Sequence, residues 1–248
     1  MMLKRTEGIV IKNKPMREAD LIVTYLTRDY GIMNLYAKSP RKVGSRFGSS
    51  LEPVTYSRIG FFGKEQTGLP RLTQSDIIKP HHGLRDSIKV FVPLSEMLEL
   101  SLRLLPERTN SRAAFSLLLN SLSAIEKEPD NPLHSIYYKI RLLQITGFAP
   151  KLHLCGRCGG DADLFFLSEG AVLCSRCRPG PGRHVLVSPP MKKVYHYLSR
   201  VRASTIGRLK LGTDVIHGLE ALMDSHINYT VVDNLKTKAY MQVTADEG

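Results

Sequence analysis

The sequence predicts an α+β protein in which an all-β part precedes an α-helical part. Before about residue 80, the apolar residues fall in short runs rich in β-branched and aromatic side chains, as in β-strands. After it, apolar residues recur about every 3.6 positions, as in amphipathic helices. All four cysteines stand in two CxxC pairs within the helical part. We therefore expect two domains, residues 1–80 and 81–248, with a small insertion at about residues 151–183 in the second.

Five short runs in the first domain predict five strands. Polar or glycine-containing segments separate the runs, which is typical of tight turns. Five strands in about 80 residues fit a small closed barrel of the OB type. The runs are Gly8–Ile11, Leu21–Leu26, Ile32–Tyr36, Val54–Ile59 and Arg71–Ile78.

Apolar stripes in the second domain predict a helical core. Two leucine-rich stripes, each followed by a proline, predict the first two helices. Asn131-Pro132 is a good cap and first-turn pair for a third helix, which Gly147 ends. After the cysteines, Ser188-Pro189 starts a fourth helix, and a fifth begins near Thr213. The cysteines therefore lie in an insertion between helices of one core.

The cysteines predict a zinc site. Cys155 and Cys158 form the first CxxC pair, and Cys174 and Cys177 form the second, fifteen residues later. Two such pairs present four thiolates to one tetrahedral Zn²⁺. The residues between the pairs alternate and predict a hairpin, so we expect a short zinc ribbon. Because four thiolates leave no position for water, this zinc is expected to be structural.

Two other interpretations of the cysteines are weaker. Disulfides belong to oxidising compartments, and the sequence shows no secretory signal. A redox CxxC usually accompanies a βαβ pattern, which is missing here. His153 and His184 flank the pairs as alternative ligands, although four thiolates already complete the shell.

The formal net charge of +12 is concentrated in the first domain. Residues 1–80 hold 14 Lys and Arg against 7 Asp and Glu, whereas residues 81–150 hold 8 against 7. Such a field attracts nucleic acid. A membrane surface is the weaker candidate, because neither a basic amphipathic helix nor a lipidation signal is visible. No run of about 18 apolar residues is present to span a bilayer, so we expect a soluble, cytoplasmic protein.

The basic segment after the third predicted strand is the strongest nucleic-acid candidate. It carries Lys38, Arg41, Lys42 and Arg46 among glycines and serines that let the backbone approach phosphates. Phe47 offers a ring that can stack on an unpaired base. The alternative is a solvated loop whose charges only keep it exposed. The surrounding barrel favours binding.

Lys12, Lys14 and Arg17 surround the first predicted turn and add to the positive field. Residues of this kind are more often a plain solvated face than a designed site. The sequence contains no P-loop, HExxH, GxSxG or Rossmann glycine pattern. We therefore expect no catalytic residue.

Several stretches carry a family likeness. They are Glu7-Gly-Ile-Val-Ile-Lys12, Glu18-Ala-Asp-Leu21, Thr27-Arg-Asp-Tyr-Gly31, Ala37-Lys-Ser-Pro-Arg-Lys42 with Ser45-Arg46, Leu51-Glu-Pro53, and Leu142-Leu-Gln-Ile-Thr-Gly-Phe-Ala-Pro150 leading into the first CxxC pair. In their order along the chain and in their residues, these stretches resemble the bacterial RecO family of recombination-mediator proteins, and the resemblance covers nearly the full chain. One departure is Ser39-Pro40, where the family usually has glycine, and this stiffens the backbone.

The resemblance implies an OB barrel, a helical core and a zinc ribbon. It also implies that the chain binds single- and double-stranded DNA and anneals complementary strands. With RecR, it would help RecA displace single-strand-binding protein (SSB) during gap repair, so RecR, the SSB tail and the bacterial nucleoid are the expected associations. Two rivals are an RNA- or ribosome-associated zinc-ribbon protein, which the same basic barrel would serve, and a zinc hydrolase, which a closed Cys₄ shell opposes.

Overall fold

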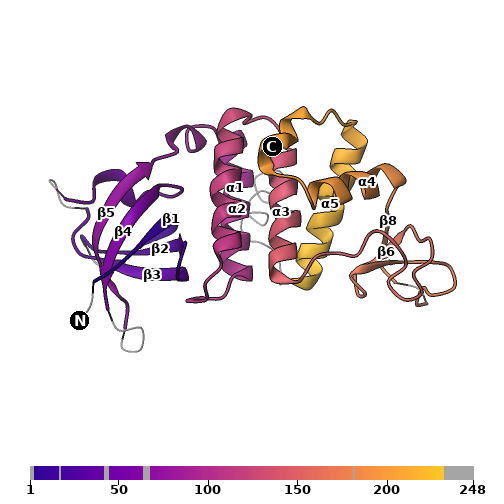
Figure 1. The fold of residues 1–248 in the computed structure, drawn as a ribbon, viewed down its shortest axis with the longest axis horizontal. Helices are drawn as coiled ribbons and strands as arrows, with labels where there is room; N and C mark the ends of the chain where they lie inside the picture. The colour runs from indigo at the N-terminus through magenta and orange to yellow at the C-terminus, as the bar shows by residue number, and fades with distance from the viewer. Residues whose placement is uncertain (1–2, 17, 42–44, 64–67, 181, 232–248) are drawn as a thin grey trace. The chain divides into compact units, whose positions relative to one another are not determined.

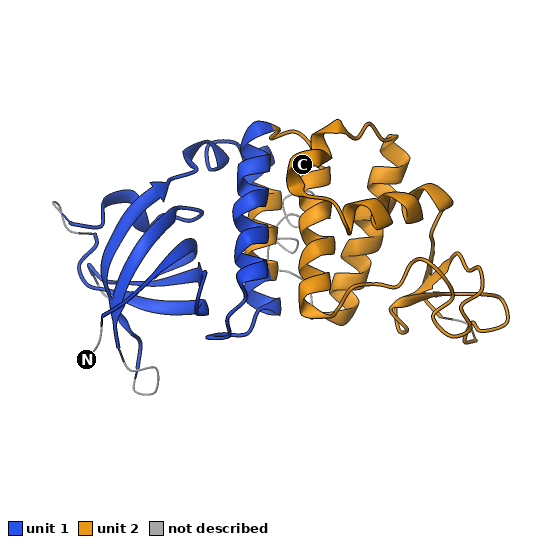
Figure 2. Ribbon diagram, viewed as in Figure 1, with its two compact units in different colours: residues 1–91, 101–127 blue, residues 92–100, 128–248 orange. Residues whose placement is uncertain are grey.

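A computed structural model describes residues 3–16, 18–41, 45–63, 68–180 and 182–231 (Figure 1). The chain divides into two compact units (Figure 2). The first comprises Met1–Phe91 and Ser101–Lys127, and the second comprises Val92–Leu100 and Glu128–Gly248. One helix thus contributes to both units, and the expected domain division at residues 80 and 81 stays a prediction.

The first unit contains a closed five-stranded barrel, which confirms the predicted fold class. Its strands lie in the order β1-β2-β3-β5-β4. Because β1 is long, its first half pairs with β4 and its second half with β2. A parallel contact between β3 and β5 closes the barrel. The strands are β1 (Leu3–Pro15), β2 (Leu21–Thr27), β3 (Gly31–Ala37), β4 (Tyr56–Phe62) and β5 (Arg71–Lys79).

The barrel is filled by the inward-facing residues of its strands, since alternate side chains of a strand point to opposite faces. The segment between β3 and β4 adds a plug that includes the short 3₁₀ helix η1 (Gly48–Leu51). The buried cluster comprises Val10, Val23, Tyr25, Met33, Leu35, Ala37, Phe47, Leu51, Ile59, Phe61 and Leu72.

The linker between the first two helices lies along β3. Ile32 forms a parallel bridge with Glu107, and the Arg108 amide donates to the Ile32 carbonyl at 3.0 Å. Gly31 has a φ of +66°, and a Cβ there would lie 2.0 Å from the Thr109 carbonyl oxygen. Only glycine therefore fits where the linker meets the strand.

The helices follow the predicted pattern, with one difference. α1 (Ile88–Leu104) begins before its leucine stripe and contains Pro93. η2 (His82–Leu84) precedes it, and α2 (Arg112–Lys127) belongs to the first unit. The remaining helices are α3 (Leu133–Thr146), α4 (Pro189–Leu198), η3 (Ala203–Arg208) and α5 (Thr213–Thr230).

The predicted start of α4 and the predicted end of α3 are confirmed, whereas the N-cap residue of α3 is Pro132 and not the predicted Asn131. The Ser188 hydroxyl accepts from the Met191 amide at 3.5 Å at the start of α4. Gly147 adopts the left-handed conformation after α3, and its amide donates to the Gln144 carbonyl. This end satisfies carbonyls that the helix itself leaves unpaired.

A buried ionic cluster lies in the helical core. Lys139 on α3 is 1% exposed, and its Nζ lies 2.9 Å from a Glu96 oxygen on α1 and 2.7 Å from an Asp224 oxygen on α5. Burial lowers the pKa of Lys139, but the two carboxylates outweigh it and raise that pKa above its ordinary value. Lys139 therefore stays charged and links three helices.

The cysteine insertion is a three-stranded ribbon. β6 (Leu164–Phe166) and β7 (Ala171–Leu173) form the predicted hairpin, and β8 (His184–Leu186), which was not predicted, pairs with β6. Side chains of the helices hold the chain leading into the ribbon. The Tyr195 hydroxyl donates to the Pro150 carbonyl at 2.9 Å, and His226 Nε2 lies 2.7 Å from the Phe148 carbonyl.

No helix among the described residues is both long and apolar enough to cross a lipid bilayer.

Candidate metal centre and nucleic-acid interface

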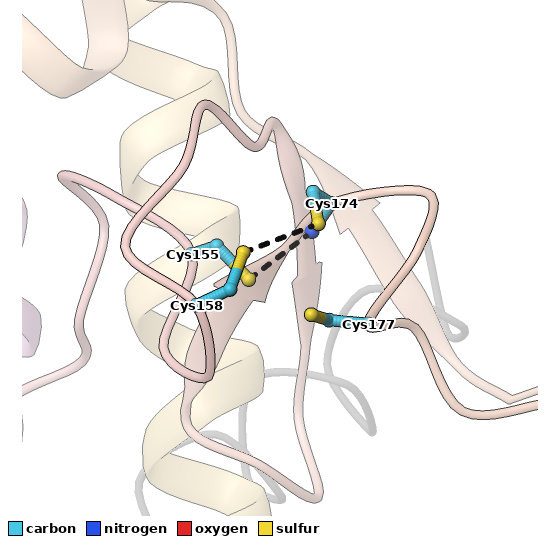
Figure 3. A group of neighbouring side chains, drawn as sticks. All are labelled: Cys155, Cys158, Cys174 and Cys177. Carbon is cyan, nitrogen blue, oxygen red and sulfur yellow. Dashed lines mark hydrogen bonds between the residues drawn. The ribbon is translucent and has the colours of Figure 1, made fainter.

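The four cysteines converge in the ribbon (Figure 3). Their Sγ atoms all lie within 4.8 Å of one another. Cys158 and Cys174, one from each pair, have their sulfurs 3.6 Å apart. None of the four forms a disulfide. The two CxxC pairs thus face each other around one point.

Backbone turns aim the sulfurs. The Cys155 amide donates to the Gly160 carbonyl at 2.8 Å, and the Gly159 amide donates to the Cys155 carbonyl at 2.9 Å. Gly159 has a φ of +73°, which glycine adopts without strain. In the second pair, the Cys177 amide donates to the Cys174 carbonyl at 3.0 Å.

The charges that the cysteine sulfurs can carry favour the binding of a cation between them. Backbone amides of Cys158, Cys174 and Arg157 lower the pKa of Cys155 to about 6. Hydrogen bonding with Cys158 and Cys174 raises the pKa of Cys177 to about 12. Sulfurs this close do not all ionise without a positive charge between them.

The donor set fits a tetrahedral metal ion. Zn–S bonds of about 2.3 Å place the sulfurs of a tetrahedron about 3.8 Å apart, which is near the 3.6 Å between the sulfurs of Cys158 and Cys174. Neither flanking histidine joins the cluster. The His153 ring lies 5.9 Å from the His196 ring, and His184 Nδ1 lies 2.9 Å from the Gly182 carbonyl. The four cysteines can therefore hold a metal ion by themselves.

One end of the barrel gathers basic residues from separate parts of the sequence. Lys14 pairs with Ile22 across β1 and β2, and Leu21 pairs with Ala37 across β2 and β3. The end of β1 therefore lies beside the chain that leaves β3. Exposed cations at this end are Lys12, Lys14, Lys38 and Arg41.

Asp20 holds the start of the basic segment. Its Oδ1 accepts from the Ser39 amide at 2.8 Å, and its Oδ2 accepts from the Tyr36 hydroxyl at 2.7 Å. The Arg41 amide also donates to the Ala19 carbonyl at 3.4 Å. This role of Asp20 was not predicted from the sequence. The available signal was the two acids Glu18 and Asp20 beside the first turn of a basic domain.

Phe47 is not the predicted stacking surface. It is 3% exposed and belongs to the barrel core. The Arg46 guanidinium lies 4.9 Å from its ring centroid. The prediction for Phe47 is wrong because the later part of the segment turns back to plug the barrel, where an aromatic ring is better buried than solvated.

The structure describes some of the remaining residues that were predicted to contact DNA, but not all of them. Arg46 is exposed, whereas Arg17 and Lys42 lie outside the described residues. Among the residues that the structure describes, Lys12, Lys14, Lys38 and Arg41 form no salt bridge. The barrel thus presents positive charge that no described carboxylate neutralises.

Comparison with known proteins gives the same family over both parts of the chain. The family model described as "Recombination protein O N terminal" matches residues 1–81, and "Recombination protein O C terminal" matches residues 92–239. A protein of Thermodesulfovibrio yellowstonii named DNA repair protein RecO is 39% identical over 240 residues, which cover 94% of each chain.

More distant relatives carry the same name. The protein of Exiguobacterium sibiricum is 28% identical and covers 91% of both chains. That of Frankia casuarinae is 36% identical over 72% of this chain and 75% of its own. The chain therefore belongs to the recombination protein O (RecO) family of DNA repair proteins.

Proposed function

We propose that this protein is a non-enzymatic recombination mediator that binds single- and double-stranded DNA and anneals complementary strands. The observation that carries the proposal is the basic end of the barrel, where Lys12, Lys14, Lys38 and Arg41 are exposed without a described ion-pair partner. Arg46 adds a further exposed charge, and Arg17 and Lys42 extend the predicted set.

The physical basis is charge neutralisation. Two complementary strands repel each other through their phosphates, and a cationic surface that binds both releases counterions and lowers that repulsion. Base pairing then drives annealing without ATP. Such a surface needs many phosphate contacts and little base readout, which suits flexible Lys and Arg side chains.

We assign the cysteine cluster to one structural Zn²⁺, bound by Cys155, Cys158, Cys174 and Cys177. Four thiolates close a tetrahedral shell, so the ion has no open position for substrate or water. Its role would be to hold the ribbon strands together. A closed shell opposes a zinc hydrolase.

We further propose that the protein acts with RecR to help RecA load onto SSB-coated DNA, and that it contacts the SSB tail. The support is family membership together with the DNA-binding surface. Action on chromosomal gaps would place the protein in the bacterial cytoplasm, at the nucleoid.

A strand-annealing assay tests the proposal. Complementary strands coated with SSB are mixed with the protein without ATP, and duplex formation is followed by fluorescence. We expect faster annealing than with SSB alone. In a separate reaction that contains RecA and ATP, we expect faster RecA loading when RecR is added. No acceleration at a protein concentration that saturates the DNA contradicts the mediator function. Tighter binding to RNA than to DNA of the same sequence favours the ribosome-associated alternative.

A further inference from the structure

A row of outward-facing residues crosses the barrel next to its basic end. The pairings Lys14 with Ile22, Ile22 with Tyr36, Tyr36 with Arg71, and Arg71 with Phe62 run without a break over β1, β2, β3, β5 and β4. We call these five residues the cross-strand row. Figure 1 labels the five strands that carry it.

The row faces away from the barrel core. Its neighbours along the strands, Leu35, Ala37 and Phe61, are buried in the core, so the alternation of strand side chains directs Tyr36 and Phe62 outward. Both rings are half-buried, and Lys14 and Arg71 are exposed.

The opposite end of the same outer face is closed. Leu26 and Ile32 also point outward, yet they are 0% and 2% exposed. The linker that bridges to Ile32 covers part of this end. On β2 and β3, the outer face is therefore covered at Leu26 and Ile32 and accessible at Tyr36.

The Tyr36 ring is held in a defined orientation. Its hydroxyl donates to Asp20, the same carboxylate that accepts from the Ser39 amide. The Tyr36 amide also donates to the Pro70 carbonyl at 2.8 Å, next to Arg71. A ring fixed in this way loses little conformational freedom when a flat group stacks on it.

The chemistry of the row matches unpaired nucleotides. Arg71 lies between the rings of Tyr36 and Phe62, and Lys14 lies beyond Ile22 on the other side of Tyr36. Neighbouring strands are about 4.8 Å apart, so the two rings are separated by roughly 10 Å and can take different bases. Proteins that bind single strands combine these elements, a cationic track for phosphates and rings on which bases stack.

We propose that the cross-strand row is a base-stacking site for single-stranded DNA, in which Tyr36 and Phe62 each stack on an unpaired base and Lys14 and Arg71 contact the phosphates. The inference rests on the proposed DNA-binding function and adds to it a means of preferring single strands. Tyr36 and Phe62 take the stacking role that was predicted for Phe47, which is buried in the barrel core. A duplex hides its base faces, so it would gain only the phosphate contacts.

The chain contains no tryptophan, which allows a direct test of stacking. Tyr36→Trp and Phe62→Trp each introduce one reporter at the row, and Tyr229→Trp places a control reporter on α5, where Tyr229 is 57% exposed. The full-length variants are titrated with a single-stranded thymidine oligonucleotide and with an abasic oligonucleotide of equal length and charge.

We expect the thymidine oligonucleotide to quench the two row reporters and to leave the control unchanged. The abasic oligonucleotide should bind more weakly and quench none of them. Equal affinity for both oligonucleotides, without quenching at the row, overturns the stacking site while leaving DNA binding intact. Binding of neither oligonucleotide contradicts the proposed function itself.

Affinity measurements give a second, independent test. Tyr36→Leu and Phe62→Leu should each weaken single-strand binding by roughly 5- to 150-fold, the range for losing one base–aromatic stack. The salt dependence and duplex affinity should not change, and Tyr36→Phe, which keeps the ring, should retain most single-strand affinity. Thermal melting checks that each variant is folded. If a leucine variant does not fold, the quenching of the tryptophan variants tests stacking instead. Equal losses for single strands and duplex, or tenfold tighter binding of RNA, overturn the assignment.

Discussion

Lys139 shows how a single residue can determine the packing of the helical unit. Its ammonium group is buried between Glu96 and Asp224, which come from different helices. Because the two carboxylates raise its pKa, the contribution of this group to stability is present at neutral pH and is lost only as the pH rises through that raised value. The ionic cluster therefore does not limit stability in the neutral range.

Removing the positive charge of Lys139 should destabilise the folded protein. We expect Lys139→Met to lower the free energy of unfolding by about 3–5 kcal/mol, because it removes the cation from between the buried Glu96 and the partly buried Asp224. Lys127→Met, at an exposed position of α2, is the control and should change little. Urea unfolding measures both. Adding Glu96→Gln and Asp224→Asn should recover part of the loss, and equal effects of the two lysine changes would contradict the prediction.

Three buried histidines predict how stability depends on pH. Burial lowers the pKa of His81, His134 and His226, although Glu126, Glu128 and the Phe148 carbonyl respectively oppose the shift. Histidine in the unfolded chain has a pKa of about 6.5. The unfolded state therefore binds more protons just below that value, so stability is complete above it and falls as the pH decreases.

We expect the urea concentration at the midpoint of unfolding to decrease as the pH is lowered from 7.5 to 5.5, with zinc in excess. His226→Gln should reduce this pH dependence, because the amide can still donate to the Phe148 carbonyl but does not titrate. His217→Gln, at an exposed position of the same helix, is the matched control. A pH dependence that His226→Gln leaves unchanged would show that His226 does not contribute.

At the scale of elements, Gly31 decides how the linker meets β3. Gly31 and Gly48 both have positive φ, but only Gly31 has the Thr109 carbonyl in the position of a Cβ. Alanine at either site should cost roughly 1–2 kcal/mol for the backbone conformation. Gly31→Ala should cost clearly more, because the linker must also move. Thermal unfolding compares the two variants, and equal shifts in Tm would refute the role of the contact.

The ribbon should depend on its metal. We expect about one tightly bound zinc per chain by metal analysis of the reduced protein. Cys155→Ser or Cys177→Ser should lower thermal stability more than DNA affinity, because residues 151–185 hold only 5 Lys and Arg against 3 Asp and Glu. Ser175→Ala, between the ligands of the second pair, is the control. A folded cysteine variant with unchanged stability and no DNA binding would make the ribbon a contact surface instead.

At the scale of the whole molecule, the distribution of charge is the testable property. Changing Arg41, Lys42 and Arg46 to Ala lowers the net charge from +12 to +9. If the three residues contact phosphates, the slope of log affinity against log salt for single strands should decrease by roughly two units, about 0.7 for each contact. Sequence preference should hardly change, because phosphate contacts carry no base readout.

A matched variant separates local contact from total charge. Changing Arg200, Arg202 and Arg208 to Ala also lowers the net charge by three, but at exposed positions of the second unit. We expect its salt slope to stay near that of the original protein. If both variants show the same slope, the total charge of the protein determines the salt dependence of DNA binding, and the basic segment makes no specific contribution.

Features that depend on the local order of residues could be predicted from the amino-acid sequence. The periods of two and 3.6 located the five strands and most of the helices, because a strand or helix buries one face whatever covers it. Ser188 and Gly147 marked helix ends, since capping is completed within a few residues. The CxxC spacing predicted the cysteine cluster, because each pair forms its own tight turn.

Features that depend on contacts between distant segments could not be predicted in this way. Phe47 is in the core because the chain after β3 turns back into the barrel, and no local pattern separates a buried ring from a stacking ring. α1 extends through Pro93 although proline in a helix interior costs about 3 kcal/mol, so packing outweighs this local cost. Asp20 meets Ser39, and Tyr36 lies beside Arg71, only through strand pairing. The cross-strand row exists because the barrel closes, and closure is a property of the whole fold.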